Sequence, residues 1–281
     1  MDKDVARRMA LGGSCPGCEF SGRQLVGANF TGGNFVNAAL VGTDLRGARV
    51  IGSKFNGSDF TRADLRGASV FGTSFVNCNF SNAQLEGVEA QGANFTGAIL
   101  SGAHLRSASL QGAIFINAQF SGAQLHGAEM QGARLGGVVA DGADFSDTQM
   151  QAADFTNANL QRTSFRNAQL EGARFAGAQL EGADFHGAEL MAADLRNADL
   201  SRVRGLTQDQ LDRACITGTV GLPPGLKAHG CRQISVHVPP INMHVPPMNM
   251  HVQGGDMHTR GVDVHVPGTD IHAADDNDDP Y

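Results

Sequence analysis

Residues 92–115 read GANFTGAILSGAHLRSASLQGAIF, and every fifth residue, counted back from the final Phe, is Phe or Leu. The same frame extends far in both directions. Every position divisible by five from Phe20 to Leu200 is Phe, Leu, Val or Met, except Ala90 and Ala140. The residue two places earlier is usually small, and in 25 of the 37 units it is Ala. The sequence is therefore a five-residue repeat over most of its length.

Neither regular secondary structure can use this spacing. On an α-helix, successive large residues would lie about 140° apart, so they would form no single apolar stripe. On a flat strand, an odd interval would send them alternately to opposite faces. The chain must therefore turn a corner every five residues to keep each large side chain inside. Gly and Asn, which tolerate left-handed backbone angles, stand at the positions where these corners are expected.

The large residues also sort by type at a spacing of twenty. This sorting is expected if residues twenty apart stack directly in a densely packed core, so we predict four faces of five residues in each coil. Val88 with Ala90, and Val138 with Ala140, reverse the small and large positions, and we expect each pair to keep the local volume constant. One column of large residues contains Phe35, Phe55, Phe75, Phe95, Phe115, Leu135, Phe155, Phe175 and Leu195.

Several units carry the motif A(D/N)LXX literally, among them Ala63-Asp64-Leu65, Ala158-Asn159-Leu160 and Ala198-Asp199-Leu200. In this motif and its repetition, residues 18–200 resemble the pentapeptide repeat family. The resemblance implies an all-β fold, a right-handed quadrilateral β-helix (a β-solenoid). About nine coils spaced by about 4.8 Å would make a rod about 43 Å long. We expect residues 1–17 to form an N-terminal lead-in.

The repeat stops after Leu200, where a solenoid needs its last apolar layer covered. Thr207 is suited to be a helix N-cap with Gln210 as its capping-box partner, and Leu206 and Leu211 stand where a hydrophobic staple belongs. We therefore predict a short helix at about 208–214. The following GLPPGL resembles the C-terminal closure of family members, which makes residues 201–231 a cap.

Five cysteines, an odd number, do not suggest a secreted disulfide framework, so we expect reduced thiols. Cys15-Pro16-Gly17-Cys18 resembles half of a zinc site or a redox pair. However, neither a second CxxC nor a thioredoxin-like βαβ pattern accompanies it. A structural role at the start of the solenoid is favoured over the metal and redox alternatives.

The net charge of −7 is unevenly distributed. Residues 19–140 hold 7 acidic and 8 basic side chains, whereas residues 141–200 hold 10 acidic and 4 basic ones. No segment is basic enough to bind nucleic acid directly or an anionic membrane. The first twenty residues contain an apolar run too short for a signal peptide or a membrane span. We expect a cytoplasmic protein.

A second repeat, of seven residues, occupies the segment 232–281. Its prolines exclude a continuous coiled coil, and we expect an extended or disordered tail. Binding of a transition metal is an alternative, but seven extended residues span about 23 Å, so two histidines would meet only if the tail folded back. A linear repeat that binds a partner is another alternative. The histidines of this repeat are His237, His244, His251, His258, His265 and His272.

Outward positions of the solenoid offer surfaces. Val76, Ile114 and Ile116 fall on one face and are candidates for an interaction patch. Ile51 and Phe71 are also expected to point outward. Glutamines form an outward column at a spacing of twenty, at Gln91, Gln111, Gln131 and Gln151.

No catalytic motif is recognisable, and His104, His126 and His186 occupy ordinary outward positions. We expect no enzymatic activity and no cofactor. The favoured function is a scaffold for protein–protein interaction, with a homodimer through an end cap as one form of assembly. The alternative, implied by the resemblance, is a DNA mimic that binds a type II topoisomerase (gyrase). The excess of acidic residues in 141–200 makes this physically possible. Arginines interrupt these acidic residues, however, at Arg162, Arg166, Arg174 and Arg196. Weak metal binding by the tail is a third hypothesis.

Overall fold

A computed structural model describes residues 13–217, 221–228 and 230, all within one compact unit, Met1–Val245. Residues 1–12 and the heptad-repeat segment 232–281, with its six histidines, lie outside the described residues. The expectations for them stay predictions.

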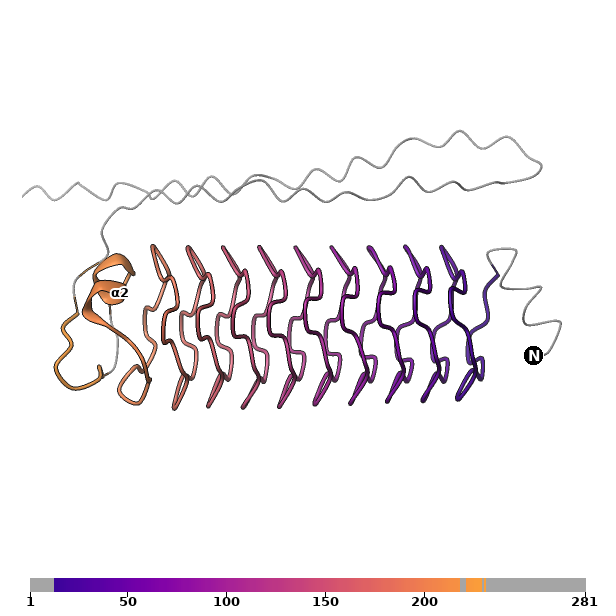
Figure 1. The fold of residues 1–281 in the computed structure, drawn as a ribbon, viewed down its shortest axis with the longest axis horizontal. Helices are drawn as coiled ribbons and strands as arrows, with labels where there is room; N and C mark the ends of the chain where they lie inside the picture. The colour runs from indigo at the N-terminus through magenta and orange to yellow at the C-terminus, as the bar shows by residue number, and fades with distance from the viewer. Residues whose placement is uncertain (1–12, 218–220, 229, 231–281) are drawn as a thin grey trace, which may run out of the picture. The chain divides into compact units, whose positions relative to one another are not determined.

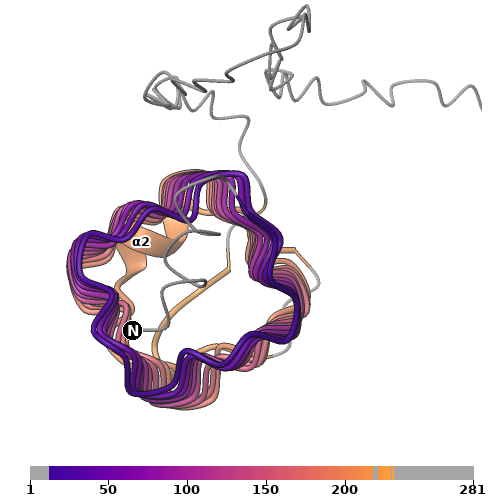
Figure 2. The ribbon, with the colours of Figure 1, turned by 90° about the vertical axis from the view of Figure 1, so that its right-hand side faces the viewer.

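The described chain is a β-helix whose successive coils are joined by parallel β-bridges (Figure 1). The bridges connect residues twenty apart, from Glu19↔Ala39 to Asp184↔Arg204. Each coil bonds to both neighbours. The N–H of Phe95 donates to the carbonyl of Ile114 in the following coil, at 2.7 Å. The N–H of Ile99 donates to the backbone carbonyl of Cys78 in the preceding coil, at 2.9 Å. Seen along the stack, the coils lie behind one another in register (Figure 2).

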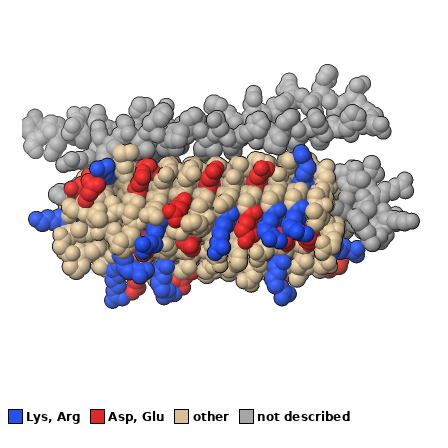
Figure 3. Space-filling view, viewed as in Figure 1, with Lys and Arg blue, Asp and Glu red and all other residues tan. Residues whose placement is uncertain are grey.

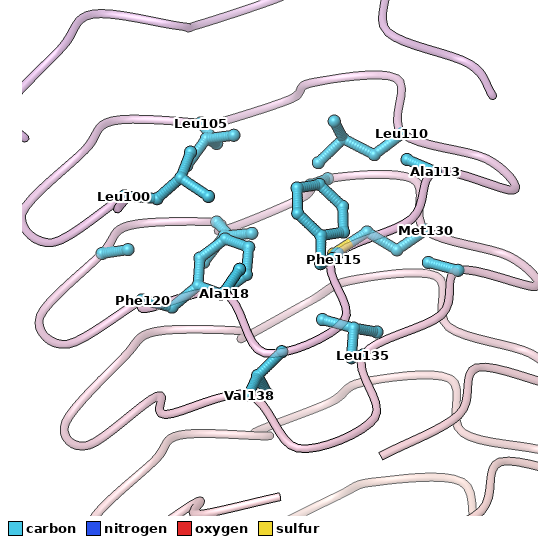
Figure 4. Close-up of a cluster of buried hydrophobic side chains, with 14 of the residues drawn as sticks. Leu100, Leu105, Leu110, Ala113, Phe115, Ala118, Phe120, Met130, Leu135 and Val138 are labelled. Carbon is cyan, nitrogen blue, oxygen red and sulfur yellow. The ribbon is translucent and has the colours of Figure 1, made fainter. Parts of the chain in front are cut away.

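The core contains the large and the small positions of the repeat, as the sequence predicts (Figure 4). Rings twenty residues apart stack directly. The ring centroids of Phe55 and Phe75 are 5.9 Å apart, those of Phe75 and Phe95 5.1 Å, and those of Phe95 and Phe115 5.0 Å. All four side chains are at most 1% exposed. The predicted stacking at a period of twenty is confirmed.

The corners of the coils have left-handed backbone angles, which explains why the residue two places after a large position is mostly Gly or Asn. Gly142, for example, has φ 64° and Asn157 has φ 58°. Ala152 and Ala192 adopt the same conformation, with φ 57° and 55°. Alanine has no side-chain hydrogen bond to offset the strain of this region, so these two corners are less favourable than glycine corners.

After the last coil the chain forms helix α2, Gln208–Arg213. Thr207 is its N-cap, and both hydrogen bonds of the predicted capping box with Gln210 are present. The side-chain amide of Gln210 also donates to the carbonyls of Phe185 (3.0 Å) and Ala188 (2.8 Å). Leu211 is fully buried. The helix is therefore anchored on the end of the coil stack by polar and apolar contacts.

The expectation of reduced thiols is wrong for the first cysteine pair, because Cys15 and Cys18 form a disulfide. The turn between them, with Gly17 at φ 69°, brings their Cα atoms to 5.5 Å, a normal separation for a disulfide. Cys78 is a free thiol in the core, and burial raises its pKa to about 12. Its Sγ lies 2.9 Å from the carbonyl of Phe55, in the preceding coil.

Candidate interaction surface

The coil register places the predicted patch on one face. Val76 and Ile116 belong to one column, two coils apart with Thr96 between them, and Ile114 lies in the neighbouring column. All three side chains are half-buried rather than protruding. The patch is therefore a shallow apolar area interrupted by a threonine.

The other apolar residues in outward positions differ from the expectation for them. Ile51 and Phe71 are only 4% and 7% exposed, so they do not present an outward surface. They occupy the same position in neighbouring coils. The most exposed large apolar residues of the described chain are Val26 (57%), Val139 (40%) and Met191 (38%). Val26 and Met191 were not singled out from the sequence, although both directly follow a large position, where the chain turns outward.

Aspartate and arginine two residues apart form local pairs on the surface. In the best-formed example, the guanidinium of Arg66 donates to both carboxylate oxygens of Asp64, at 2.9 and 2.6 Å, and the backbone N–H of Arg66 donates to Oδ1 at 3.2 Å. The Arg66 side chain holds the pKa of Asp64 below its usual range. Equivalent pairs are formed by Asp44 with Arg46 and by Asp194 with Arg196.

Arginines pair with some of the acidic residues in the segment 141–200. Arg162 pairs with Asp141, and Arg202 pairs with Glu181, each across neighbouring coils. Arg166 lies 3.3 Å from the carboxylate of Asp184. On the face drawn in Figure 3, basic and acidic side chains are interspersed. The face in Figure 3 therefore does not present a continuous acidic column.

The predicted glutamine column is present and bonds to a second column. Gln131 donates to Gln149, and Gln151 donates to Gln169, each at 2.7 Å. Glu171 takes the next position, opposite Glu189. Desolvation by burial raises the pKa of Glu171, and so do the hydrogen bond and the charge of Glu189. The Glu171 carboxyl therefore holds its proton more tightly than an exposed glutamate does.

The three histidines of the solenoid each lie beside a carboxylate. A ring nitrogen of His104 is 3.4 Å from Glu86, that of His126 is 3.3 Å from Asp147, and that of His186 is 2.5 Å from Asp184. Burial acts to raise the pKa of Asp184, but hydrogen bonds from His186 outweigh it and the pKa is lowered.

In the part of the chain that the structure describes, no three His, Cys, Asp or Glu side chains are grouped as metal ligands. A surface hollow near the last coil is lined by Gln161, Arg162, Glu181, Gly182 and Arg202. Among the residues that the structure describes, no helix is long and apolar enough to cross a bilayer.

Two family models match the chain. The model described as pentapeptide repeats (8 copies) matches residues 24–62, 63–102 and 168–204, and the model described as pentapeptide repeat region matches residues 108–185. No curated protein matches.

Similar solved structures include QnrB1, a plasmid-mediated fluoroquinolone resistance protein, in a trypsin-treated form. It is 24% identical, with 74% of this chain and 91% of that chain covered and a TM-score of 0.34. Another is the pentapeptide repeat protein Rfr23 from the cyanobacterium Cyanothece 51142, with 24% identity, coverages of 41% and 85% and a TM-score of 0.21. A third is AT2G44920 from the Arabidopsis thaliana thylakoid lumen, with 25% identity, coverages of 50% and 83% and a TM-score of 0.17. With its five-residue repeat, its twenty-residue coils and the two family models that match them, the chain belongs to the pentapeptide repeat family.

Proposed function

We propose that the protein is a non-enzymatic scaffold for protein–protein interaction. The observation that carries this proposal is the fixed register of outward residues. Backbone hydrogen bonds on both sides of each coil hold every outward column at a constant spacing. A partner therefore meets side chains whose positions are already ordered, which lowers the entropic cost of binding.

The proposed architecture is a right-handed quadrilateral shaft of about nine coils, closed at its C-terminal end by residues 201–231. The four buried positions at five-residue spacing in each twenty-residue coil support four sides. The contacts of Gln210 and Leu211 with the last coil support the cap.

The patch of Val76, Ile114 and Ile116 is the proposed contact site for a protein partner. The test is affinity capture followed by mass spectrometry, with full-length protein, a chain ending at residue 231, and two matched variants. Ile116→Ser alters the patch, and Val139→Ser removes an exposed valine from another face. We expect a partner that the wild type and V139S capture and I116S loses. A partner lost only on removal of 232–281 would assign binding to the tail instead, and equal capture by I116S and V139S would exclude the patch.

The alternative function is a DNA mimic that binds a type II topoisomerase. The excess of acidic residues in 141–200 favours it, whereas the arginine pairs of Asp141, Asp184 and Glu181 oppose it. A gyrase supercoiling assay with added protein tests it, and no effect at micromolar protein excludes this function.

The third candidate is metal binding by the six tail histidines. Titration of a 232–281 peptide with copper, nickel or zinc tests it, since saturable binding is required.

A further inference from the structure

One outward column carries charges of alternating sign. Arg134, Asp154, Arg174 and Asp194 follow one another in neighbouring coils, and parallel β-bridges join each to the next. We call these four residues the charge ladder. Because the coil spacing is about 4.8 Å, the backbone positions of these residues form a row about 14 Å long.

The arginines of the charge ladder are available to a partner. Arg134 and Arg174 are exposed, while Asp154 and Asp194 are half-buried. Neither arginine forms an ion pair with a carboxylate of the described residues, in contrast to Arg162, which pairs with Asp141. The Oδ1 atom of Asp154 accepts hydrogen bonds from the backbone (3.0 Å) and hydroxyl (2.5 Å) of Thr156, which fixes the carboxylate while its Oδ2 atom faces no described donor.

The outward column beside the charge ladder consists mainly of short side chains. It contains Gly136, Thr156 and Ala176, so no long side chain stands next to the first three charges. The column ends at Arg196, which folds back onto Asp194 with two hydrogen bonds of 2.8 Å. A second surface can therefore approach the ladder closely over most of its length.

We propose that the charge ladder binds a second copy of this chain, antiparallel, about a two-fold axis between Asp154 and Arg174. The order plus, minus, plus, minus reads minus, plus, minus, plus from the other end. Arg174 then faces Asp154 of the partner subunit. Arg134 faces the partner's Asp194, whose carboxylate Arg196 already pairs, so the two central contacts carry the interface. A two-fold dimer uses the same patch on both chains, so a self-complementary row of charges is what such an interface requires.

The association is weak and salt-sensitive. A row about 14 Å long covers far less than the roughly 800 Å² per partner of a standard stable interface. Exposed ion pairs contribute little individually and are screened by salt. The side-on pairing is also distinct from a dimer through an end cap, and it does not require the proposed scaffold function.

The test is sedimentation equilibrium of the full-length protein over a wide concentration range at low and high salt. We expect a monomer–dimer equilibrium that weakens as salt rises. Asp154→Arg and Arg174→Asp each place like charges opposite each other twice, so each variant alone should dimerise at least about tenfold more weakly. Arg106→Asp, a charge reversal at an exposed arginine outside the ladder, is the matched control and should leave the dimer unchanged.

Mixing the two single variants provides the decisive measurement. In a D154R–R174D heterodimer, every introduced charge again faces an opposite one, so the mixture should regain association that neither variant has alone. Absence of association at any concentration overturns the proposal, and so does a mixture without rescue. A dimer insensitive to both variants would lie elsewhere, for example at an end cap. If a reversal unfolds the coil, the neutral variants D154N and R174Q must still weaken the dimer more than R106Q does.

Discussion

Restoring the usual order of small and large residues at Val138 and Ala140 is a direct test of how the core fills its space. Both residues are completely buried, and they lie two positions apart in one coil. Figure 4 shows Val138 in the cluster with Ala118 and Leu135. If the valine occupies the volume that a large residue at 140 would need, Val138→Ala and Ala140→Leu should each be unfavourable alone and tolerated together.

The magnitudes follow from the atoms removed and added. V138A removes two buried methyl groups, which costs about 2 kcal/mol when the cavity is included. A140L adds three carbons in the column between Phe120 and Leu160, and overpacking of this size costs about 1–3 kcal/mol. Independent effects would sum to about 4 kcal/mol. We expect the double variant to lose less than about 1 kcal/mol, a coupling of about 3 kcal/mol.

Urea unfolding followed by far-UV circular dichroism measures the four free energies, with equal m-values as the condition for comparing them. The control combines A140L with Val88→Ala, more than two coils away, where the costs should add. Additive costs in V138A/A140L would refute the reasoning. So would stabilisation by A140L alone, because it would show unfilled space beside Ala140.

Three further predictions concern a corner, the cap and the glutamate pair. Ala152→Gly should stabilise the protein by about 0.5–1 kcal/mol because it relieves a left-handed alanine, and Gly142→Ala should do the opposite; thermal unfolding compares them. Thr207→Ala should cost about 1 kcal/mol by removing the N-cap of α2, measured by urea unfolding. Glu171→Gln should stabilise by about 0.5 kcal/mol at neutral pH. The folded-state pKa of Glu171 is raised, so the free energy of unfolding of the wild type falls as pH rises through that pKa. The gain in stability of E171Q should therefore vanish in acid. A series of unfolding curves at different pH values checks this.

The inner columns were predictable because packing leaves few choices for them. A large residue every fifth position has only one way to remain buried, and like residues twenty apart then stack, as Phe75 and Phe95 do. The capping box was predictable for a similar reason, since Thr207 and Gln210 act through their sequence spacing alone.

The outward side chains were less predictable, because several conformations suit each of them. The sequence places Ile51 and Phe71 outside the core, yet both are covered. Arginines were counted as interruptions of the acidic segment, but their pairing with particular acids depends on side-chain reach between coils. The disulfide of Cys15 and Cys18 depends on a turn geometry that CxxC spacing permits without requiring it.

The same register that makes the core predictable gives the charge ladder two separable effects. Opposite charges in neighbouring coils of one chain also attract each other, so reversing Arg174 weakens the coil as well as the proposed dimer. Stability alone therefore says nothing about association. Mixing D154R with R174D separates the two effects, because each chain keeps its own unfavourable neighbours in the mixture while the contacts between chains become favourable. If the mixture regains association while the unfolding temperature of each variant alone stays unchanged, that association can come only from contact between two copies.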